Sequence, residues 1–332
     1  MTLPLSSRQR LVFLIFTFLL FIFGGFWFFN FHKTPRSLSP TPSSYPSSTH
    51  LSQTNHLTNF LFLGIGGQGH QAPDLTDTII LISYNHQTGH LTLLPLPRDL
   101  WFDNYHAKIN TLYHYSLDKY PQTSLNQTKK MFSQVIGLPI HYLAILDFHG
   151  FVNLIDLVGG VDVDVKRSFD DYKYPIPGKE TAEPVSARYE HLHFEAGYQH
   201  MNGQLALKFA RSRHALGPEG SDFARSRRQE QVIRAFLKKL FSSSILLQPR
   251  TLSKLKNQLQ QSLLTDLPLS TLPTLTKLAL SLKKNPNNLL NATLVPLLKE
   301  PKSFQAYGGQ WVLIPRTNWQ AIHDYIRQQV NR

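Results

Sequence analysis

An uninterrupted apolar run near the N-terminus is the feature that most constrains this chain. It reads "LVFLIFTFLLFIFGGFWFF" (Leu11–Phe29), nineteen residues without a charge and with Thr17 as the only polar side chain. At 1.5 Å rise per residue, a helix of about this length crosses the roughly 30 Å hydrocarbon core of a bilayer. A cleaved signal peptide has a shorter apolar region and a small-residue cleavage site. The following "GFWFFNFHK" offers no such site, so we expect a retained single-pass anchor.

The residues on either side of this run predict its orientation. Residues 1–10 carry Arg8 and Arg10, which indicates a short cytoplasmic tail. Residues 30–56 are rich in Ser, Thr and Pro and lack apolar periodicity, which is typical of an extended stalk. We therefore expect residues 57–332 to form an extracytoplasmic domain. The chain has no cysteine, which excludes disulfides and thiolate metal sites.

Strand and helix patterns alternate along the domain and predict an α/β layered sheet. Strands are expected at 59–65, 77–85, 90–97, 141–147, 161–165 and 310–315. Helices are expected at 108–120, 124–136, 148–158, 202–211, 222–241, 251–264, 270–284 and 318–330, with Asp222 as the N-cap of the fifth.

Positive charge is concentrated in one window of the chain. The formal net charge is +13, and residues 201–250 hold ten Lys/Arg against three acidic residues. The pentapeptide FARSR occurs there twice, at 209–213 and 223–227. This excess predicts an anionic partner, unless it is an ordinary solvated basic face.

The two FARSR copies lie in different predicted elements. The first ends a short helix and places Arg211 and Arg213 in the following loop. The second opens a long helix, where Arg225, Arg228 and Gln229 share one face at spacings i, i+3 and i+4. That face borders the apolar stripe formed by Ile233, Phe236 and Leu240, whereas Arg227 falls on another side. Several guanidinium groups beside a helix N-terminus suit pyrophosphate, because Arg binds phosphate bidentately and stays charged.

Three further motifs contain candidates for chemistry. Asp77 begins a predicted strand beside a glycine-rich loop. A carboxylate there could bind Mg²⁺, or it could simply cap a turn. Arg98 and Asp99 follow a predicted strand in "PLPRD". They are either site residues or an ion pair on the surface. Lys108 is expected to open a helix, where it would favour an anion, although many helices begin this way.

Other functional classes find no support in the sequence. There is no Walker loop, and "GIGGQG" is not followed by the helix of a dinucleotide site. "HLH" (191–193) lacks the further ligands that a zinc site needs. Nucleic acid is not expected as a partner, because stacking aromatics do not interleave the arginines.

The ordered set "DLTDT…LPLPRD…KIN…GFVNLIDLVGGVDVDV…GYQHMNGQLALKFARSR…DFARSRRQ" resembles the LytR-CpsA-Psr family. The resemblance covers residues 59–240, and the C-terminal extension 245–332 is less specific. It implies a central mixed β-sheet with helices on both faces. It also implies a membrane-bound phosphotransferase that moves a glycopolymer from a polyprenyl pyrophosphate carrier to a peptidoglycan acceptor.

The resemblance also assigns residue roles. Asp77 matches the Mg²⁺-binding aspartate, and the matches to the pyrophosphate-binding set are Arg98, Arg211, Arg213, Arg225 and Gln229. Asp99, Lys108, Asp222 and Arg228 fall in the same motifs. Asp77, Arg98 and Asp99 are the expected catalytic residues, with either carboxylate as the proton acceptor.

The sequence departs from the family pattern at two positions, and it leaves other activities open. The family usually has an arginine where Leu75 stands and an aspartate about where Gly66 stands, for which Asp74 is the candidate replacement. A non-catalytic binder of an anionic wall polymer, tethered to the membrane, would show the same charge and anchor. A pyrophosphatase, with water as acceptor, is the other alternative.

Overall fold

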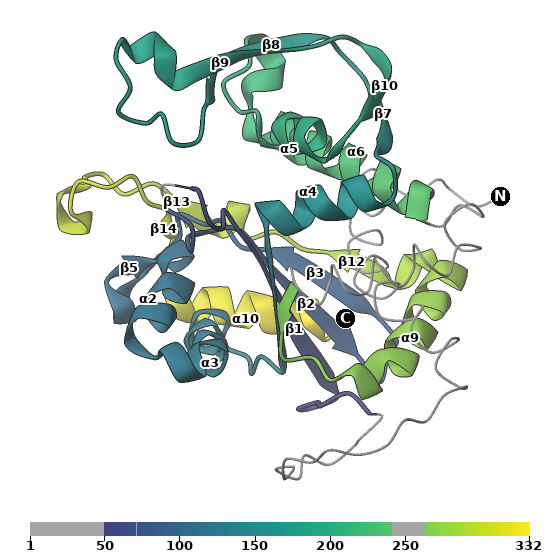
Figure 1. The fold of residues 1–332 in the computed structure, drawn as a ribbon. Coiled ribbons are helices and arrows are strands. Elements are labelled where there is room, and N and C mark those ends of the chain that lie inside the picture. Colours follow the sequence, from purple (N-terminus) through teal and green to yellow (C-terminus); the bar gives the residue numbers. More distant parts are fainter. Residues whose placement is uncertain (1–49, 71, 241–262) are drawn as a thin grey trace, which may run out of the picture.

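A six-stranded mixed sheet forms the centre of the computed structural model, which describes residues 50–70, 72–240 and 263–332 (Figure 1). The strand order is β11-β6-β1-β2-β3-β12. The strands are β1 (Leu57–Ile65), β2 (Thr76–Asn85), β3 (Leu91–Pro95), β6 (Tyr142–Asp147), β11 (Leu263–Thr265) and β12 (Leu289–Asn291). β1 runs parallel to β6 and antiparallel to β2, so the predicted mixed sheet is confirmed.

A tight turn connects β2 to β3. The side-chain oxygen of Asn85 accepts hydrogen bonds from the backbone N–H groups of Gln87 and Thr88. Gly89 adopts a φ of 72°, which lies in the left-handed region that glycine enters without steric cost. The turn therefore sets the antiparallel register of the two strands.

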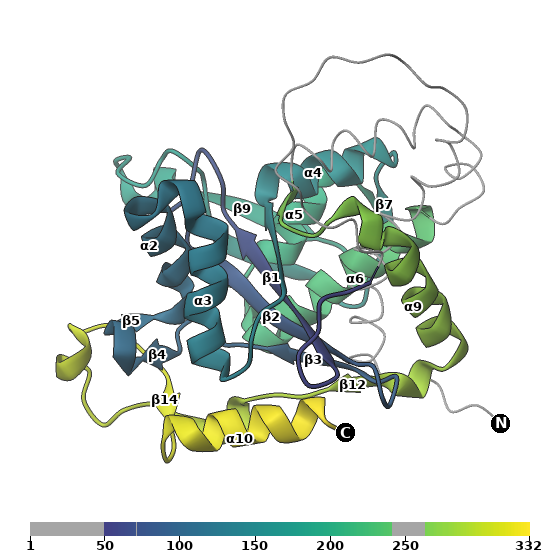
Figure 2. The ribbon, with the colours of Figure 1, turned by 90° about the horizontal axis from the view of Figure 1, so that it is seen from below.

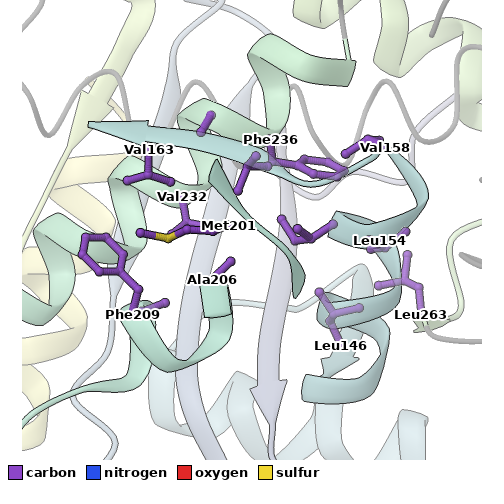
Figure 3. Close-up of a cluster of buried hydrophobic side chains, with 14 of the residues drawn as sticks. Leu146, Leu154, Val158, Val163, Met201, Ala206, Phe209, Val232, Phe236 and Leu263 are labelled. Atoms are coloured by element: carbon purple, nitrogen blue, oxygen red, sulfur yellow. The ribbon is translucent and has the colours of Figure 1, made fainter. Parts of the chain in front are cut away.

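Helices cover both faces of the sheet, as the views in Figures 1 and 2 show. On one face lie α2 (Leu112–Lys119), α3 (Ser124–Ile136) and α10 (Trp319–Val330). On the other lie α4 (Phe148–Leu157), α5 (Gly203–Arg211), α6 (Asp222–Leu240) and α9 (Leu272–Lys284). Each face has its own apolar core, and Figure 3 shows Leu154, Phe209 and Phe236 within the second.

Four short strands form two ribbons outside the central sheet. β7 (Val161–Val165) pairs with β10 (Gly197–Met201), and β8 (Phe169–Pro175) pairs with β9 (Tyr189–Phe194). Figure 1 shows these ribbons arching over α5 and α6. The strand expected at 161–165 is therefore present, but it belongs to a ribbon rather than to the layered sheet.

The remaining strands are two residues long. They are β4 (Trp101–Phe102), β5 (Ala107–Lys108), β13 (Leu298–Lys299) and β14 (Ile314–Pro315). The strand expected at 310–315 is reduced to β14, because Gln310 and Trp311 are exposed and Leu313 forms only an isolated parallel bridge with Leu100.

Two predictions about helix starts are wrong. Lys108 lies on β5 in extended backbone, before a 3₁₀ turn at Ile109–Thr111, and α2 begins only at Leu112. Asp222 is the first residue of α6, and the residue before it, Ser221, accepts a hydrogen bond through Oγ from Ala224 N–H. A serine can cap a helix in this way, which leaves Asp222 in the first turn.

Several predictions fall on residues that the structure does not describe. They are the tail, the anchor Leu11–Phe29, residues 30–49 of the stalk and most of the helix expected at 251–264. Within residues 50–70, 72–240 and 263–332, none of the helices combines the length and hydropathy that crossing a bilayer requires.

Candidate active site at one edge of the sheet

The ends of four strands meet at the same edge of the sheet. β1 and β6 are parallel and finish together, with Ile65 opposite Asp147. β2 begins there, because Thr76 pairs with Ile65, and β3 finishes there, because Pro95 pairs with Ile80. The segments that follow or precede these ends therefore converge, although they are far apart in the sequence.

A chain of ion pairs links the predicted residues at this edge. Arg98 Nη1 donates to Asp77 Oδ1 at 2.5 Å, and Arg98 Nε donates to Asp99 Oδ2 at 3.2 Å. Lys108 Nζ donates to Asp99 Oδ1 at 2.9 Å. Burial acts to lower the pKa of Arg98, but Asp77 and Asp99 outweigh it and raise that pKa above its usual range. The structure thus brings together four of the residues that the sequence singled out.

Backbone contacts hold the Arg98–Asp99 loop on both sides. Arg98 C=O accepts from Asn110 N–H at 3.2 Å, and Asp99 C=O accepts from Leu313 N–H at 2.9 Å. Trp101 N–H in turn donates to Leu313 C=O at 2.9 Å. The C-terminal segment therefore positions a predicted site loop, which no local pattern in the sequence indicated.

Arg211 packs against an aromatic side chain that lies at this edge of the sheet. Its guanidinium carbon lies 4.3 Å from the ring centroid of Phe148, the first residue of α4. Arg211 Nη1 also lies 3.3 Å from the hydroxyl oxygen of Tyr174. On the same Phe148 ring, His70 makes an edge contact with centroids 5.0 Å apart. Phe148, Tyr174 and His70 were not expected at the site, because aromatic and histidine positions carry no spacing signal of their own.

The other predicted anion-binding residues lie on neighbouring segments. Arg213 is exposed in the segment after α5. Arg225 and Gln229 are partly buried on the first two turns of α6. Arg227 has 59 % of its side chain exposed and lies on another side of α6, as expected.

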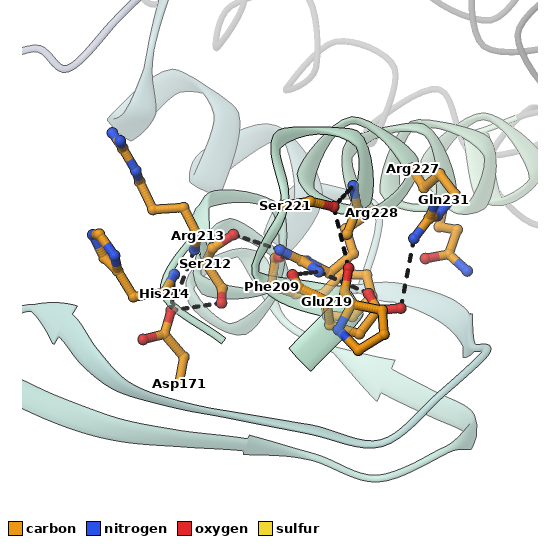
Figure 4. Close-up of polar contacts among 12 residues, drawn as sticks. Asp171, Phe209, Ser212, Arg213, His214, Glu219, Ser221, Arg227, Arg228 and Gln231 are labelled. Atoms are coloured by element: carbon orange, nitrogen blue, oxygen red, sulfur yellow. Dashed lines mark hydrogen bonds and ion pairs between the residues drawn. The ribbon is translucent and has the colours of Figure 1, made fainter. Parts of the chain in front are cut away.

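Arg228 is a structural arginine. It is 2 % exposed, and its Nε donates to Phe209 C=O at 3.0 Å. Its Nη1 donates to both the backbone oxygen and a carboxylate oxygen of Glu219 at 2.9 Å, and Nη2 donates to Ser212 C=O. The prediction that Arg228 contacts pyrophosphate therefore disagrees with this geometry, because the buried guanidinium already makes four hydrogen bonds inside the protein (Figure 4).

Asp171 holds residues 212–214 from the side opposite Arg228. This fully buried carboxylate accepts through Oδ2 from Ser212 Oγ at 2.7 Å and from the backbone N–H groups of Arg213 and His214 at 3.3 and 3.2 Å. Figure 4 shows Asp171 and Arg228 on either side of Ser212. Together they fix the backbone that carries Arg211 and Arg213. The sequence contained one signal for Asp171, a polar residue at an inward position of β8.

Asp77 has the chemistry that a magnesium ion needs. Its side chain is 45 % exposed, and Oδ1 accepts the Arg98 hydrogen bond. Mg²⁺ is commonly held by one or two carboxylates together with substrate phosphates and waters. One partly exposed carboxylate beside the guanidinium of Arg98 fits this pattern. Asp74 lies 3.6 Å from His114 Nδ1 and is partly exposed at the same edge.

The histidines of "HLH" lie away from this edge, on β9. His191 and His193 both contact Asp170 Oδ1, at 2.7 and 2.8 Å. No group of three or more His, Asp and Glu with the geometry to hold a metal ion is found in the described part of the chain.

Sequence comparison with known proteins identifies the family. The model of the LytR_cpsA_psr family matches residues 30–316, so the chain belongs to the LytR-CpsA-Psr family. The polyisoprenyl-teichoic acid–peptidoglycan teichoic acid transferase TagV of Bacillus subtilis is 26 % identical over 193 residues, which are 56 % of this chain and 44 % of TagV. TagU of Bacillus cereus is 28 % identical over 54 % of this chain and 52 % of its own length.

A third relative and two solved structures agree with this assignment. The cell wall biosynthesis protein LcpA of Corynebacterium glutamicum is 29 % identical over 60 % of this chain and 39 % of LcpA. The match thus spans about half or less of each curated relative.

The crystal structure of Bacillus subtilis TagV has a TM-score of 0.53 at 21 % identity and covers 84 % of this chain and 99 % of that chain. The structure described as TagT bound to LI-WTA gives 0.53 at 20 % identity, covering 86 % and 96 %. These similarities show the fold.

Proposed function

We propose that this chain is a phosphotransferase that moves a glycopolymer from a polyprenyl pyrophosphate carrier to peptidoglycan or another cell-envelope acceptor. The observation that carries the proposal is the ion-pair chain from Asp77 through Arg98 and Asp99 to Lys108, at the same edge as Arg211. The relatives named as teichoic acid transferases support this assignment.

The site residues supply positioning and charge stabilisation, which dominate the catalysis of phosphoryl transfer. Arg98 is oriented by two carboxylates, so its remaining N–H groups are aimed before a substrate arrives. Arg211 is held on Phe148 and Tyr174 and presents a permanent positive charge from the other side. Arg213, Arg225 and Gln229 extend this set along the substrate.

In the proposed reaction a sugar hydroxyl of the acceptor attacks the glycan-side phosphorus. The new O–P bond forms as the phosphoanhydride P–O bond breaks, and polyprenyl phosphate leaves with the bonding electron pair. Asp77 would hold Mg²⁺, which supplies charge neutralisation to the pyrophosphate when it is bound. We further propose that Leu11–Phe29 anchors the domain outside the membrane, within reach of a lipid-linked donor.

Incubation of the full chain with a labelled polyprenyl-pyrophosphate glycan and a peptidoglycan acceptor tests the proposal. A transferase forms a glycan–acceptor adduct, whereas a pyrophosphatase releases free glycan phosphate. A non-catalytic binder retains the intact donor, and this result would overturn the proposed activity. Retention of the full-length chain in membranes after a carbonate wash tests the anchor, and a mature N-terminus near residue 35 would contradict it.

A further inference from the structure

The loop after β1 is built so that it carries a histidine back over the edge of the sheet. Gly67 N–H donates to Pro73 C=O at 2.8 Å and closes the loop, and His70 N–H donates to Gly67 C=O at 3.3 Å. Gly67 has a φ of +77°, and a Cβ there would come within 2.8 Å of Asp147 Cβ. Only glycine fits this position. The loop therefore passes close to Asp147, the N-cap of α4.

His70 lies over Gly66 at the end of β1. A Cβ added to Gly66 would be 3.1 Å from His70 Cβ and 3.2 Å from His70 Cγ. The imidazole is partly buried and makes a T-shaped contact with the Phe148 ring, over which the guanidinium of Arg211 lies. In the described part of the chain, no hydrogen bond occupies either ring nitrogen of His70.

The two carboxylates that the sequence indicated as proton acceptors are both engaged by cations. Asp77 accepts from Arg98, and Asp99 accepts from Arg98 and from Lys108. We propose that His70 is the general base of the transfer, a role that rests on the proposed function. One ring nitrogen of the neutral imidazole takes the proton of the acceptor hydroxyl while its oxygen bonds to phosphorus. The proton passes from the imidazolium to solvent after polyprenyl phosphate has left.

The charges around His70 favour its neutral form. Burial lowers its pKa below the ordinary value, and electrostatic interactions with Arg211 on α5 and His149 on α4 lower it further. The carboxylates of Asp77 on β2 and Glu180 act in the opposite direction. The imidazole is therefore unprotonated at neutral pH, which is the state a base requires.

Three variants of the full chain, assayed with the labelled donor and acceptor, test this role. His70→Gln keeps a polar side chain of similar length without a titrating ring, and we expect its kcat to fall by about 10²–10⁴-fold. Binding of the donor should change less than about threefold, since charge recognition remains with the arginines. His70→Ala should regain part of its rate when free imidazole is added. His200→Gln, an exposed histidine on β10, is the matched control and should retain the wild-type rate.

The pH dependence supplies a readout that a purely structural role would not change. The wild-type rate should fall on the acid side, at a pH below about 6.5, and this acid limb should be absent in His70→Gln. A His70→Gln variant that reacts at the wild-type rate, or that keeps the acid limb, overturns the role of His70 alone. Wild-type protein that forms neither adduct nor free glycan phosphate overturns the proposed function and the base together. If water is the acceptor, the same dependence on His70 is expected for release of glycan phosphate.

Discussion

The guanidinium of Arg228 donates through Nη2 to the backbone carbonyl of Ser212 and so joins the two FARSR copies. Arg228 directly follows the second copy, whereas Ser212 is inside the first. A second bond from Nε reaches Phe209 C=O, which is also in the first copy. The repeat therefore places arginines at the end of α5 and at the start of α6, and the arginine after it holds these two segments together.

Replacement of Arg228 by Met should cost about 3–5 kcal/mol of unfolding free energy, since it leaves the partly buried Glu219 carboxylate without its main partner. Urea unfolding measures the change. Arg227→Met, at an exposed position of the same helix, should cost no more than about 1 kcal/mol. Equal losses in the two variants would show that Arg228 is not the structural residue described above.

Asp171→Asn should destabilise the fold by about 1.5–3 kcal/mol, because Ser212 Oγ and two backbone N–H groups lose a charged acceptor. We also expect weaker donor binding, since the segment carrying Arg213 loses its anchor. Asp118→Asn on α2, with 63 % of the side chain exposed, is the control. Unchanged stability and unchanged binding in Asp171→Asn would argue against this anchoring.

Arg213→Ala and Arg225→Ala should each weaken binding of the lipid pyrophosphate by about 1.5–3 kcal/mol, the usual contribution of a hydrogen bond to a charged group. The double variant should deviate from additivity, because both residues act on one ligand group. Arg227→Ala should cost only a few tenths of a kcal/mol, as expected of an exposed charge. Titrations at two salt concentrations separate this outcome from a basic face, for which all losses are small and disappear at high salt.

Asp77→Ala should abolish Mg²⁺-dependent transfer and leave the midpoint of thermal unfolding nearly unchanged, because a half-exposed carboxylate contributes little packing. The labelled-donor assay with and without Mg²⁺ provides the measurement. Full activity at equal stability would remove Asp77 from the mechanism.

His193 and His70 should titrate on opposite sides of the ordinary histidine pKa of about 6.5. Hydrogen bonds to Glu195 and Asp170 raise the pKa of His193, whereas burial lowers that of His70. Because the folded pKa of His193 is raised, its stabilising effect is fully present below about pH 6.5 and is lost as pH rises through the folded pKa. NMR titration of the two imidazoles checks the order, and a reversed order would contradict both assignments.

Much of the fold followed from local patterns in the sequence. Apolar runs with turn residues between them predicted β1, β2, β3 and β6, and the apolar stripes predicted α4, α5 and α6. Asp77, Arg98 and Asp99 were found because polar side chains beside strand ends are local features. The pairing of β7 with β10 was not predictable, because strand partners far apart in the sequence are chosen by packing.

The sequence by itself therefore determined the strands β1, β2, β3 and β6, the helices α4, α5 and α6, and where positive charge gathers. Helical spacing placed Arg227 and Arg228 on different sides of α6, but only the tertiary structure showed that Arg228 donates to Phe209, Ser212 and Glu219 inside the protein. It likewise placed Lys108 against Asp99, Asp171 beneath Ser212, and His70 on Phe148. These relations depend on long-range contacts between elements, and residue type and spacing carry no information about such contacts.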